Sequence, residues 1–194
     1  MPCLVLINGG PAAGKSTLAW RYAADHPLTV VLDIDLVRSM VGGWKQHPLE
    51  AGRLARQLAV AAIPAALHGG HVVVIPQLLG RVDFVEELAS TAESVGVPFV
   101  EVSLIVSVET ALGRYRSRSA ASRDNVEVAE PAADPSSVVP AHIAAVERVV
   151  AERRRTVRLG GEDGDEPYPH LLAAIEAASK GDDPPAGART SSHR

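Results

Sequence analysis

The chain has 194 residues, of which 46% are apolar and 22% are charged, and its net charge at pH 7 is −4. This length and composition suit one globular domain with a sizeable core, and the negative balance counts against a large nucleic-acid surface. The single cysteine, Cys3, rules out an internal disulfide. No apolar run approaches the roughly 20 residues of a membrane span, and the first residues carry neither a basic flank nor a cleavage site. We therefore expect a cytoplasmic protein that does not enter a membrane.

Strands and helices alternate along the chain. The first apolar run, 4–8, is continuous, which is typical of a parallel strand buried on both faces. Pro64 lies inside the long apolar segment 49–68 and is expected to kink that helix or end it early. The predicted strands are 4–8, 28–33, 71–75, 99–106 and 156–159. The predicted helices are 15–24, 36–41, 49–68, 81–95, 108–118, 141–155 and one that begins near Tyr168. This alternation predicts an α/β fold with a parallel sheet.

The C-terminal third contains two segments that lack a clear period. Segment 119–140 is rich in Ala, Ser, Asp and Pro, so it is expected to be a mobile loop. Segment 180–194 is polar and contains Pro and Gly, so it is expected to be a disordered tail. The sequence therefore predicts one domain at 1–179 followed by this tail.

Residues 9–16 match the G-x-x-x-x-G-K-[ST] phosphate-binding pattern in full. The glycines let backbone N–H groups turn toward phosphate oxygens, and the helix that follows directs its positive N-terminus at the anion. Lys15 is placed to reach the β- and γ-phosphates, Ser16 to bind Mg²⁺ through its hydroxyl, and Thr17 to assist nearby. The predicted nucleotide-binding residues are Gly9, Gly10, Pro11, Ala12, Ala13, Gly14, Lys15, Ser16 and Thr17. The sequence thus predicts a site for ATP, or another nucleoside triphosphate, with Mg²⁺.

Two acidic residues stand where the second predicted strand ends. Ligands of doubly wound sheets bind outside the carboxyl ends of the strands, so Asp33 and Asp35 are expected to face the P-loop, on one side if the chain stays extended. One carboxylate can accept the proton of an attacking hydroxyl and the other can hold Mg²⁺ through water. Arg38 can bind an anionic or polyhydroxyl substrate. Alternatively, Asp35 is a helix N-cap and Arg38 a surface charge, and the two roles of Asp35 are compatible.

Segments 6–17 and 33–38 together resemble the P-loop small-molecule kinases, among them the zeta-toxin-like sugar-nucleotide kinases, chloramphenicol phosphotransferase, gluconate kinases and adenylylsulfate kinases. The similarity covers roughly 4–178 in layout, although only these two segments are specific. It implies the P-loop NTPase fold, with a five-stranded parallel sheet, helices on both faces and a mobile lid at about 114–140. It also implies ATP·Mg²⁺ as phosphoryl donor, with the position of Asp35 as general base.

One position departs from the pattern of these kinases. The third predicted strand runs into Pro76 and Gln77, where many of them carry an acid. Gln77 can hydrogen-bond the acceptor or a metal-bound water, but it supplies no charge, which strengthens the metal role of Asp33 beside Ser16. Alternatively, Gln77 is a loop residue whose side chain satisfies backbone groups.

Arginines follow the fourth predicted strand. Arg114 and Arg118 are four residues apart and share a helix face. Related kinases place arginines here in the lid, and the guanidinium fork suits phosphate oxygens and the charge of the transferring phosphoryl group. We therefore group Arg114 and Arg118 with Lys15 and Asp35 as candidate catalytic residues; alternatively, both arginines interact favourably with the helix C-terminus. For 153–155 we favour a solvated helix end.

The sequence predicts a kinase that transfers the γ-phosphoryl group of ATP·Mg²⁺ to a hydroxyl of a small molecule, such as a metabolite, a sugar nucleotide or an antibiotic. A polynucleotide 5′-hydroxyl kinase is an alternative, but it needs a basic groove with stacking aromatics. The net negative charge and the two Trp, three Tyr and two Phe count against nucleic acid. A non-enzymatic ATP-dependent switch is a third possibility, and it would leave Asp33, Asp35 and the arginines redundant. Neither the acceptor nor the oligomeric state follows from the sequence.

Overall fold

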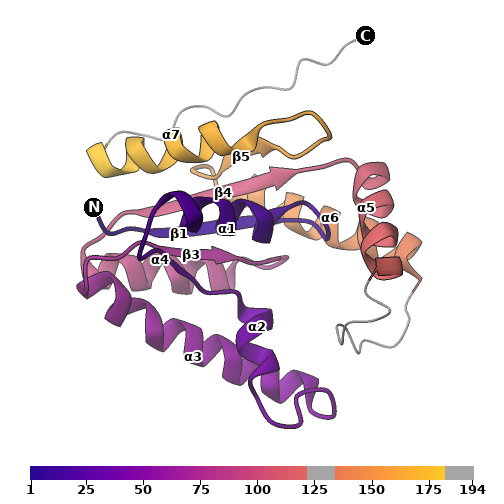
Figure 1. The fold of residues 1–194 in the computed structure, drawn as a ribbon, viewed down its shortest axis with the longest axis horizontal. Coiled ribbons are helices and arrows are strands. Elements are labelled where there is room, and N and C mark those ends of the chain that lie inside the picture. Colours follow the sequence, from indigo (N-terminus) through magenta and orange to yellow (C-terminus); the bar gives the residue numbers. More distant parts are fainter. Residues whose placement is uncertain (122–133, 182–194) are drawn as a thin grey trace.

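The computed structural model describes residues 1–121 and 134–181 (Figure 1). A five-stranded sheet forms its centre, with strand order β2-β3-β1-β4-β5 and all neighbouring pairs parallel. The strands are β1 (Leu4–Gly9), β2 (Val30–Val31), β3 (Val73–Pro76), β4 (Phe99–Ile105) and β5 (Val157–Gly160). This architecture confirms the predicted α/β fold of the P-loop NTPase type.

Helices cover both faces of the sheet (Figure 1). They are α1 (Lys15–Asp25), α2 (Ile34–Ser39), α3 (Pro48–His68), α4 (Asp83–Val95), α5 (Val108–Ala121), α6 (Pro135–Glu152) and α7 (Pro167–Lys180). Side chains of α1 and α7 share one core with Val5 and Ile7 of β1, whereas side chains of α3 and α4 share the other with Leu4 and Leu6. Successive strand side chains point to opposite faces, so β1 is buried throughout, as its continuous apolar run predicts. Within the described ranges, none of the helices has the length and hydropathy to cross a membrane.

The second strand is shorter than its apolar run suggested. β2 contains only Val30 and Val31, and α2 already begins at Ile34. The N-cap of α2 is Asp33, whose Oδ1 accepts a hydrogen bond from Asp35 N at 3.0 Å. The expectation that Asp35 caps this helix is therefore wrong, and so is the extended chain that would set both carboxylates on one side. An N-cap residue leaves the strand conformation and turns the chain into the helix.

Helix α3 does not end early at Pro64. It continues to His68 and is closed by Gly69. Ile63 and Leu67 flank Pro64 and are buried, with exposed fractions of 0% and 2%. Packing of these side chains holds the last turn of the helix in place although proline removes one backbone hydrogen bond.

The segment expected to be a mobile loop, 119–140, is partly helical. Helix α5 extends to Ala121, and α6 begins at Pro135 after Asp134 as N-cap, whose Oδ1 accepts a hydrogen bond from Ser136 N at 3.0 Å. An acid followed by proline is a favoured helix start, and the low-complexity composition concealed this signal. The rest of the expected loop, 122–133, lies outside the described residues. So does 182–194 of the expected tail, whereas Lys180 belongs to α7.

The arginines after α6 are not all solvated. Arg153 Nε donates a hydrogen bond to Glu101 Oε2 at 2.9 Å, and Thr156 Oγ1 donates to Glu101 Oε1 at 2.6 Å. Glu101 lies in β4 and is 5% exposed. A buried carboxylate requires charged and hydrogen-bonding partners, so Arg153 has a structural role that its position in an exposed-looking basic run did not suggest.

Candidate phosphate and acceptor site

The loop between β1 and α1 is shaped by three glycines. Gly9 (φ 152°) and Gly14 (φ 95°) adopt backbone conformations that other residues rarely reach. A Cβ atom on Gly9 would lie 2.9 Å from Leu104 O, and one on Gly10 would lie 2.7 Å from Ile143 Cγ1. Side chains are therefore excluded where the loop passes β4 and α6, as the phosphate-binding pattern requires.

Asn8 anchors the start of this loop. The side chain is fully buried, and its Oδ1 accepts hydrogen bonds from Gly9 N at 2.8 Å and Leu79 N at 2.9 Å. Its Nδ2 donates to Leu79 O at 3.1 Å. Beside this clamp, Gln77 N donates to Ile7 O at 3.1 Å. Asn8 thus joins the phosphate loop to the segment that follows β3.

Lys15 and Ser16 occupy the first turn of α1. The Nζ of Lys15 donates a hydrogen bond to Gly10 O at 2.8 Å, so the ammonium group lies across the loop. The hydroxyl of Ser16 donates to Asp33 Oδ2 at 3.3 Å. The structure thus brings together the two residues that the sequence assigned to Mg²⁺. A hydroxyl and a carboxylate oxygen are hard ligands of the kind this ion prefers.

Asp35 and Arg38 lie one turn apart on α2. Asp35 Oδ1 is 3.3 Å from Arg38 Nη2, and the side chains are 65% and 29% exposed. The guanidinium group of Arg38 stands over the ring of Trp44, with its central carbon 5.2 Å from the ring centroid. Asp33 is the cap, and the exposed Asp35 carboxylate lies in the first turn of the same helix.

Gln77 follows β3 directly. Strands β2 and β3 are neighbours, so Gln77 leaves the same edge of the sheet as Asp33. Its Oε1 is buried and has no hydrogen-bond partner among the described residues. The amide oxygen therefore does not satisfy backbone groups of the loop, contrary to the structural alternative for this residue.

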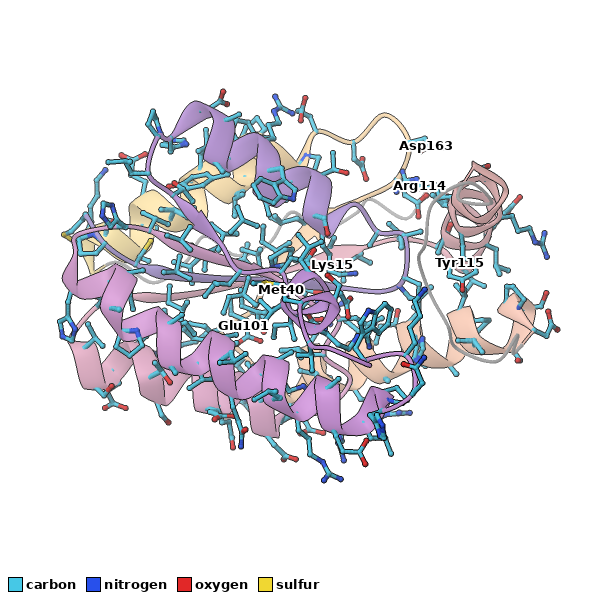
Figure 2. All side chains as sticks on the ribbon, turned by 60° about the horizontal axis from the view of Figure 1, so that its bottom comes forward. Lys15, Met40, Glu101, Arg114, Tyr115 and Asp163 are labelled. Carbon is cyan, nitrogen blue, oxygen red and sulfur yellow. The ribbon has the colours of Figure 1, made fainter. Side chains whose placement is uncertain are left out.

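Arg114 contacts the loop between β5 and α7 (Figure 2). Its Nη1 donates to Gly161 O at 2.8 Å, while Nε and Nη2 donate to Asp163 Oδ1 at 3.2 and 2.5 Å. Helix α5 continues to Ala121, so Arg114 is well inside the helix and the alternative role at a helix C-terminus is wrong for it. Arg118 belongs to the same helix, but its side chain lies outside the described part of the structure. Catalytic roles for both arginines stay predictions.

A cavity of about 450 Å³ opens beside the phosphate loop. One wall contains Ala13, Thr17 and Arg21, and the opposite wall contains Arg114, Gly161 and Glu162. The Glu162 carboxylate accepts hydrogen bonds from the Thr110 hydroxyl and Ser107 N, and these bonds lower the pKa of Glu162 below its usual range. Residues 160–167 form an irregular loop, and such a loop has no sequence period that would indicate a binding wall.

Comparison with known protein families agrees with the phosphate-binding loop in placing the chain among P-loop proteins. Residues 4–136 match the model of a family described as an AAA domain. The chain belongs to this family. Its members are P-loop kinase-like proteins. No curated protein matches the sequence.

Several solved structures share the fold of this AAA-domain protein. A gluconokinase from Sinorhizobium meliloti 1021 has a TM-score of 0.58 and 18% identity, over 92% of this chain and 95% of that one. The tunicamycin resistance protein of Deinococcus radiodurans has a TM-score of 0.58 and 17% identity, over 94% and 97%. A chain of the PezAT toxin–antitoxin system of Streptococcus pneumoniae has a TM-score of 0.59 and 15% identity, over 82% and 68%. At such identities the similarity establishes a P-loop kinase-like fold.

Sequence reasoning missed two parts of this site in the AAA-domain protein. Asn8 was read as the end of an apolar strand, although a polar side chain in a buried strand must find partners. The cavity wall from 160–167 is brought to the phosphate loop by the β4–β5 pairing, which links residues far apart in the chain. The first omission had a signal in the sequence, whereas the second depends on tertiary structure.

Proposed function

We propose that this protein is a cytoplasmic kinase that transfers the γ-phosphoryl group of ATP·Mg²⁺ to a hydroxyl group of a small molecule. The observation that carries the proposal is the 3.3 Å hydrogen bond between Ser16 and Asp33. It joins the hydroxyl of a complete phosphate loop to an acid at the end of a nearby strand. Membership of a P-loop kinase-like family supports the same reaction class.

The donor nucleotide binds on the side of the phosphate loop. Backbone amides of 9–14 and the N-terminus of α1 hold the phosphates, and Lys15 exchanges its bond to Gly10 O for phosphate oxygens. The nucleoside occupies the cavity of about 450 Å³ between α1 and the β5–α7 loop. Arg114, on the wall of that cavity, and Arg118, one turn later, bind phosphate oxygens and offset their negative charge.

The Ser16 hydroxyl and the Asp33 carboxylate fit Mg²⁺ and would hold it, the carboxylate through water. When bound, the ion neutralises charge on the β- and γ-phosphates. Asp33 also caps α2, so one carboxylate oxygen orients the acceptor helix while the other faces Ser16. Because both carboxylate oxygens are hydrogen-bonded, the Asp33 side chain is held in one orientation.

The acceptor binds beside α2, where Asp35, Arg38 and Gln77 surround it. Asp35 accepts the proton of the attacking hydroxyl. The hydroxyl oxygen forms a bond to the γ-phosphorus, the bond from that phosphorus to the β–γ bridging oxygen breaks, and ADP leaves with the electron pair. The products are ADP and a phosphate monoester.

Calorimetric titration of ATP with Mg²⁺ into wild-type protein and Lys15→Ala tests nucleotide binding. The variant removes the cation at the β- and γ-phosphates, so affinity or turnover should nearly vanish. Lys180→Ala is the matched control, because Lys180 is exposed at the end of α7 and pairs with Glu176. If Lys15→Ala kept both the wild-type affinity and the wild-type turnover, the nucleotide site would be elsewhere.

A screen for acceptors then tests phosphoryl transfer. ADP production is measured with sugars, nucleosides and aminoglycoside-like compounds, and the phosphorylated product is identified by mass spectrometry. Product formation that requires both Lys15 and the acceptor is the expected result. ATP binding without transfer to any hydroxyl compound would count against a kinase and for a nucleotide-dependent switch.

A further inference from the structure

Two buried polar atoms without partners lie on the acceptor side of the site. In the described part of the chain, three buried side-chain nitrogen or oxygen atoms lack a hydrogen-bond partner: Arg38 Nε, Gln77 Oε1 and Ser103 Oγ. Ser103 is inside β4, in the interior of the sheet. Arg38 and Gln77 are in segments that follow β2 and β3. Buried polar groups in proteins are normally satisfied, and each exception requires an explanation.

The strand register places both residues at one edge of the sheet. Val30 pairs with Val73 and Val31 pairs with Val74, so β2 and β3 end side by side. Leu32 N still donates to Val74 O at 2.9 Å, just before the chain turns into α2. Gln77 N donates to Ile7 O, the last residue but one before the phosphate loop. Arg38 and Gln77 therefore follow two neighbouring strands at the edge of the sheet from which the phosphate loop also leaves.

The two atoms require opposite hydrogen-bond partners. Arg38 Nε carries a hydrogen and can only donate, whereas Gln77 Oε1 can only accept. The charge of Arg38 is already offset by Asp35 at 3.3 Å, and its face is against Trp44. A carboxylate or phosphate would satisfy Arg38 but would set its lone pairs against Gln77 Oε1. A hydroxyl group satisfies both atoms, because it donates one hydrogen and accepts another.

We propose that the acceptor is an uncharged polyhydroxyl compound in which one hydroxyl bridges Arg38 Nε and Gln77 Oε1 while a neighbouring hydroxyl is phosphorylated. This inference rests on the proposed kinase function and deepens it. Arg38 and Gln77 form hydrogen bonds with the hydroxyl next to the reacting one. The reacting hydroxyl itself faces Asp35.

Acceptor probes of matched shape test the inference. ADP release by the full chain is measured with myo-inositol and methyl glucoside as neutral compounds with neighbouring hydroxyls. Cyclohexanol carries an isolated hydroxyl, and gluconate and glucose 6-phosphate carry a negative charge. The neutral polyols should show the highest kcat/KM, by about tenfold or more, since the others leave one buried polar atom unpaired. Equal or better turnover of cyclohexanol or of the anionic compounds overturns the inference.

Substitutions at Gln77 separate the two ends of the amide. Gln77→Met keeps the length but removes hydrogen bonding, so KM for the polyol should rise about tenfold or more with little change in ADP·Mg²⁺ affinity. Gln77→Glu can still accept from the hydroxyl and should retain more activity than Gln77→Met. Gln57→Met, on the exposed face of α3, is the matched control. Loss that is equal in Gln77→Met and Gln77→Glu would show that the amide nitrogen binds the acceptor, which overturns the proposed class.

The outcomes also separate this inference from the kinase proposal. If ADP·Mg²⁺ does not bind, or if ATP consumption survives Lys15→Ala, the kinase proposal fails. If ADP·Mg²⁺ binds and no polyol in the panel is phosphorylated, only the acceptor class is overturned. Arg38→Lys keeps the charge but removes the Nε donor, and it should raise the KM for the polyol without weakening ADP·Mg²⁺ binding. An unchanged KM in that variant contradicts the bridging hydroxyl.

Discussion

The two sides of the candidate site are built in different ways. On the phosphate side, Asn8 is fully buried with three hydrogen bonds, and Gly9 and Gly10 pack directly against β4 and α6. On the acceptor side, Asp35 is 65% exposed, and one atom each of Arg38 and Gln77 is buried without a partner among the described residues. The fold itself therefore determines the phosphate side, whereas the acceptor side depends on a few side chains that can change without altering the sheet.

The largest effect is expected on the acceptor side, in Asp35→Asn. Asparagine keeps the shape of the side chain but cannot accept the proton of the hydroxyl. We expect kcat to fall by roughly 10²–10⁴-fold, as is typical for loss of a general base, with little change in ATP affinity. Once an acceptor is known, steady-state kinetics and calorimetry measure the two quantities separately.

Asp33→Asn serves as the comparison for Asp35→Asn, since Asp33 is the residue of this segment that we assign to Mg²⁺. It should shift the Mg²⁺ dependence of the reaction, because an amide holds a metal-bound water less well than a carboxylate. Turnover of Asp35→Asn at the wild-type rate would mean that the base is elsewhere or that the transition state needs none. Equal loss of ATP binding in both variants would instead make the pair a joint metal site.

On the phosphate side, Asn8→Ala tests whether the loop depends on its buried anchor. The substitution leaves Gly9 N, Leu79 N and Leu79 O without their partner. We expect a loss of about 3 kcal/mol of unfolding free energy, or a fall in Tm of roughly 6–12 °C for a domain of this size. Urea and thermal unfolding measure it, with exposed Gln57→Ala as control. A loss below about 1 kcal/mol would show that water replaces the side chain.

The same contrast explains what could be predicted from sequence. The phosphate loop and the five strands follow from local pattern: a full motif, apolar runs and glycines at fixed spacing. The acceptor side was less predictable. Both Asp33 and Asp35 are residues that favour the N-cap position, and the sequence does not show that Asp33 is the one that caps α2 and turns the chain. The contacts of Arg114 with Asp163 and of Arg153 with Glu101 join distant segments. Local pattern contains no information on such pairs, so their roles emerge only from the fold.

A smaller effect is expected at Ala12, which has φ 54° in the phosphate loop. A left-handed conformation costs an L residue about 1–2 kcal/mol, while glycine loses roughly 0.5–1 kcal/mol more entropy on folding. Ala12→Gly should therefore raise the unfolding free energy by up to about 1.5 kcal/mol. Ala24→Gly, at an exposed position in α1, should lower it by about 1 kcal/mol. If Ala12→Gly and Ala24→Gly lowered the unfolding free energy in urea equally, Ala12 would carry no strain in the free protein.

The smallest effect concerns the wall of the cavity beside the phosphate loop. Hydrogen bonds from the Thr110 hydroxyl and Ser107 N lower the pKa of Glu162 from 4.5 in the folded protein. A carboxylate with a depressed folded-state pKa stabilises the protein above its unfolded-state pKa, and this contribution is lost as the pH falls through the folded-state value.

Glu162→Gln tests this contribution. The Tm of wild type should exceed that of Glu162→Gln by no more than a few degrees near neutral pH, and the difference should shrink as the pH falls below 4.5. Thermal scans of both proteins and of the exposed control Glu87→Gln give the comparison. A Tm difference that stays constant between neutral pH and pH 3 would mean that Glu162 acts through shape rather than charge. The start of α5 would then be held in the same way as the phosphate loop, by neutral hydrogen bonds to the backbone.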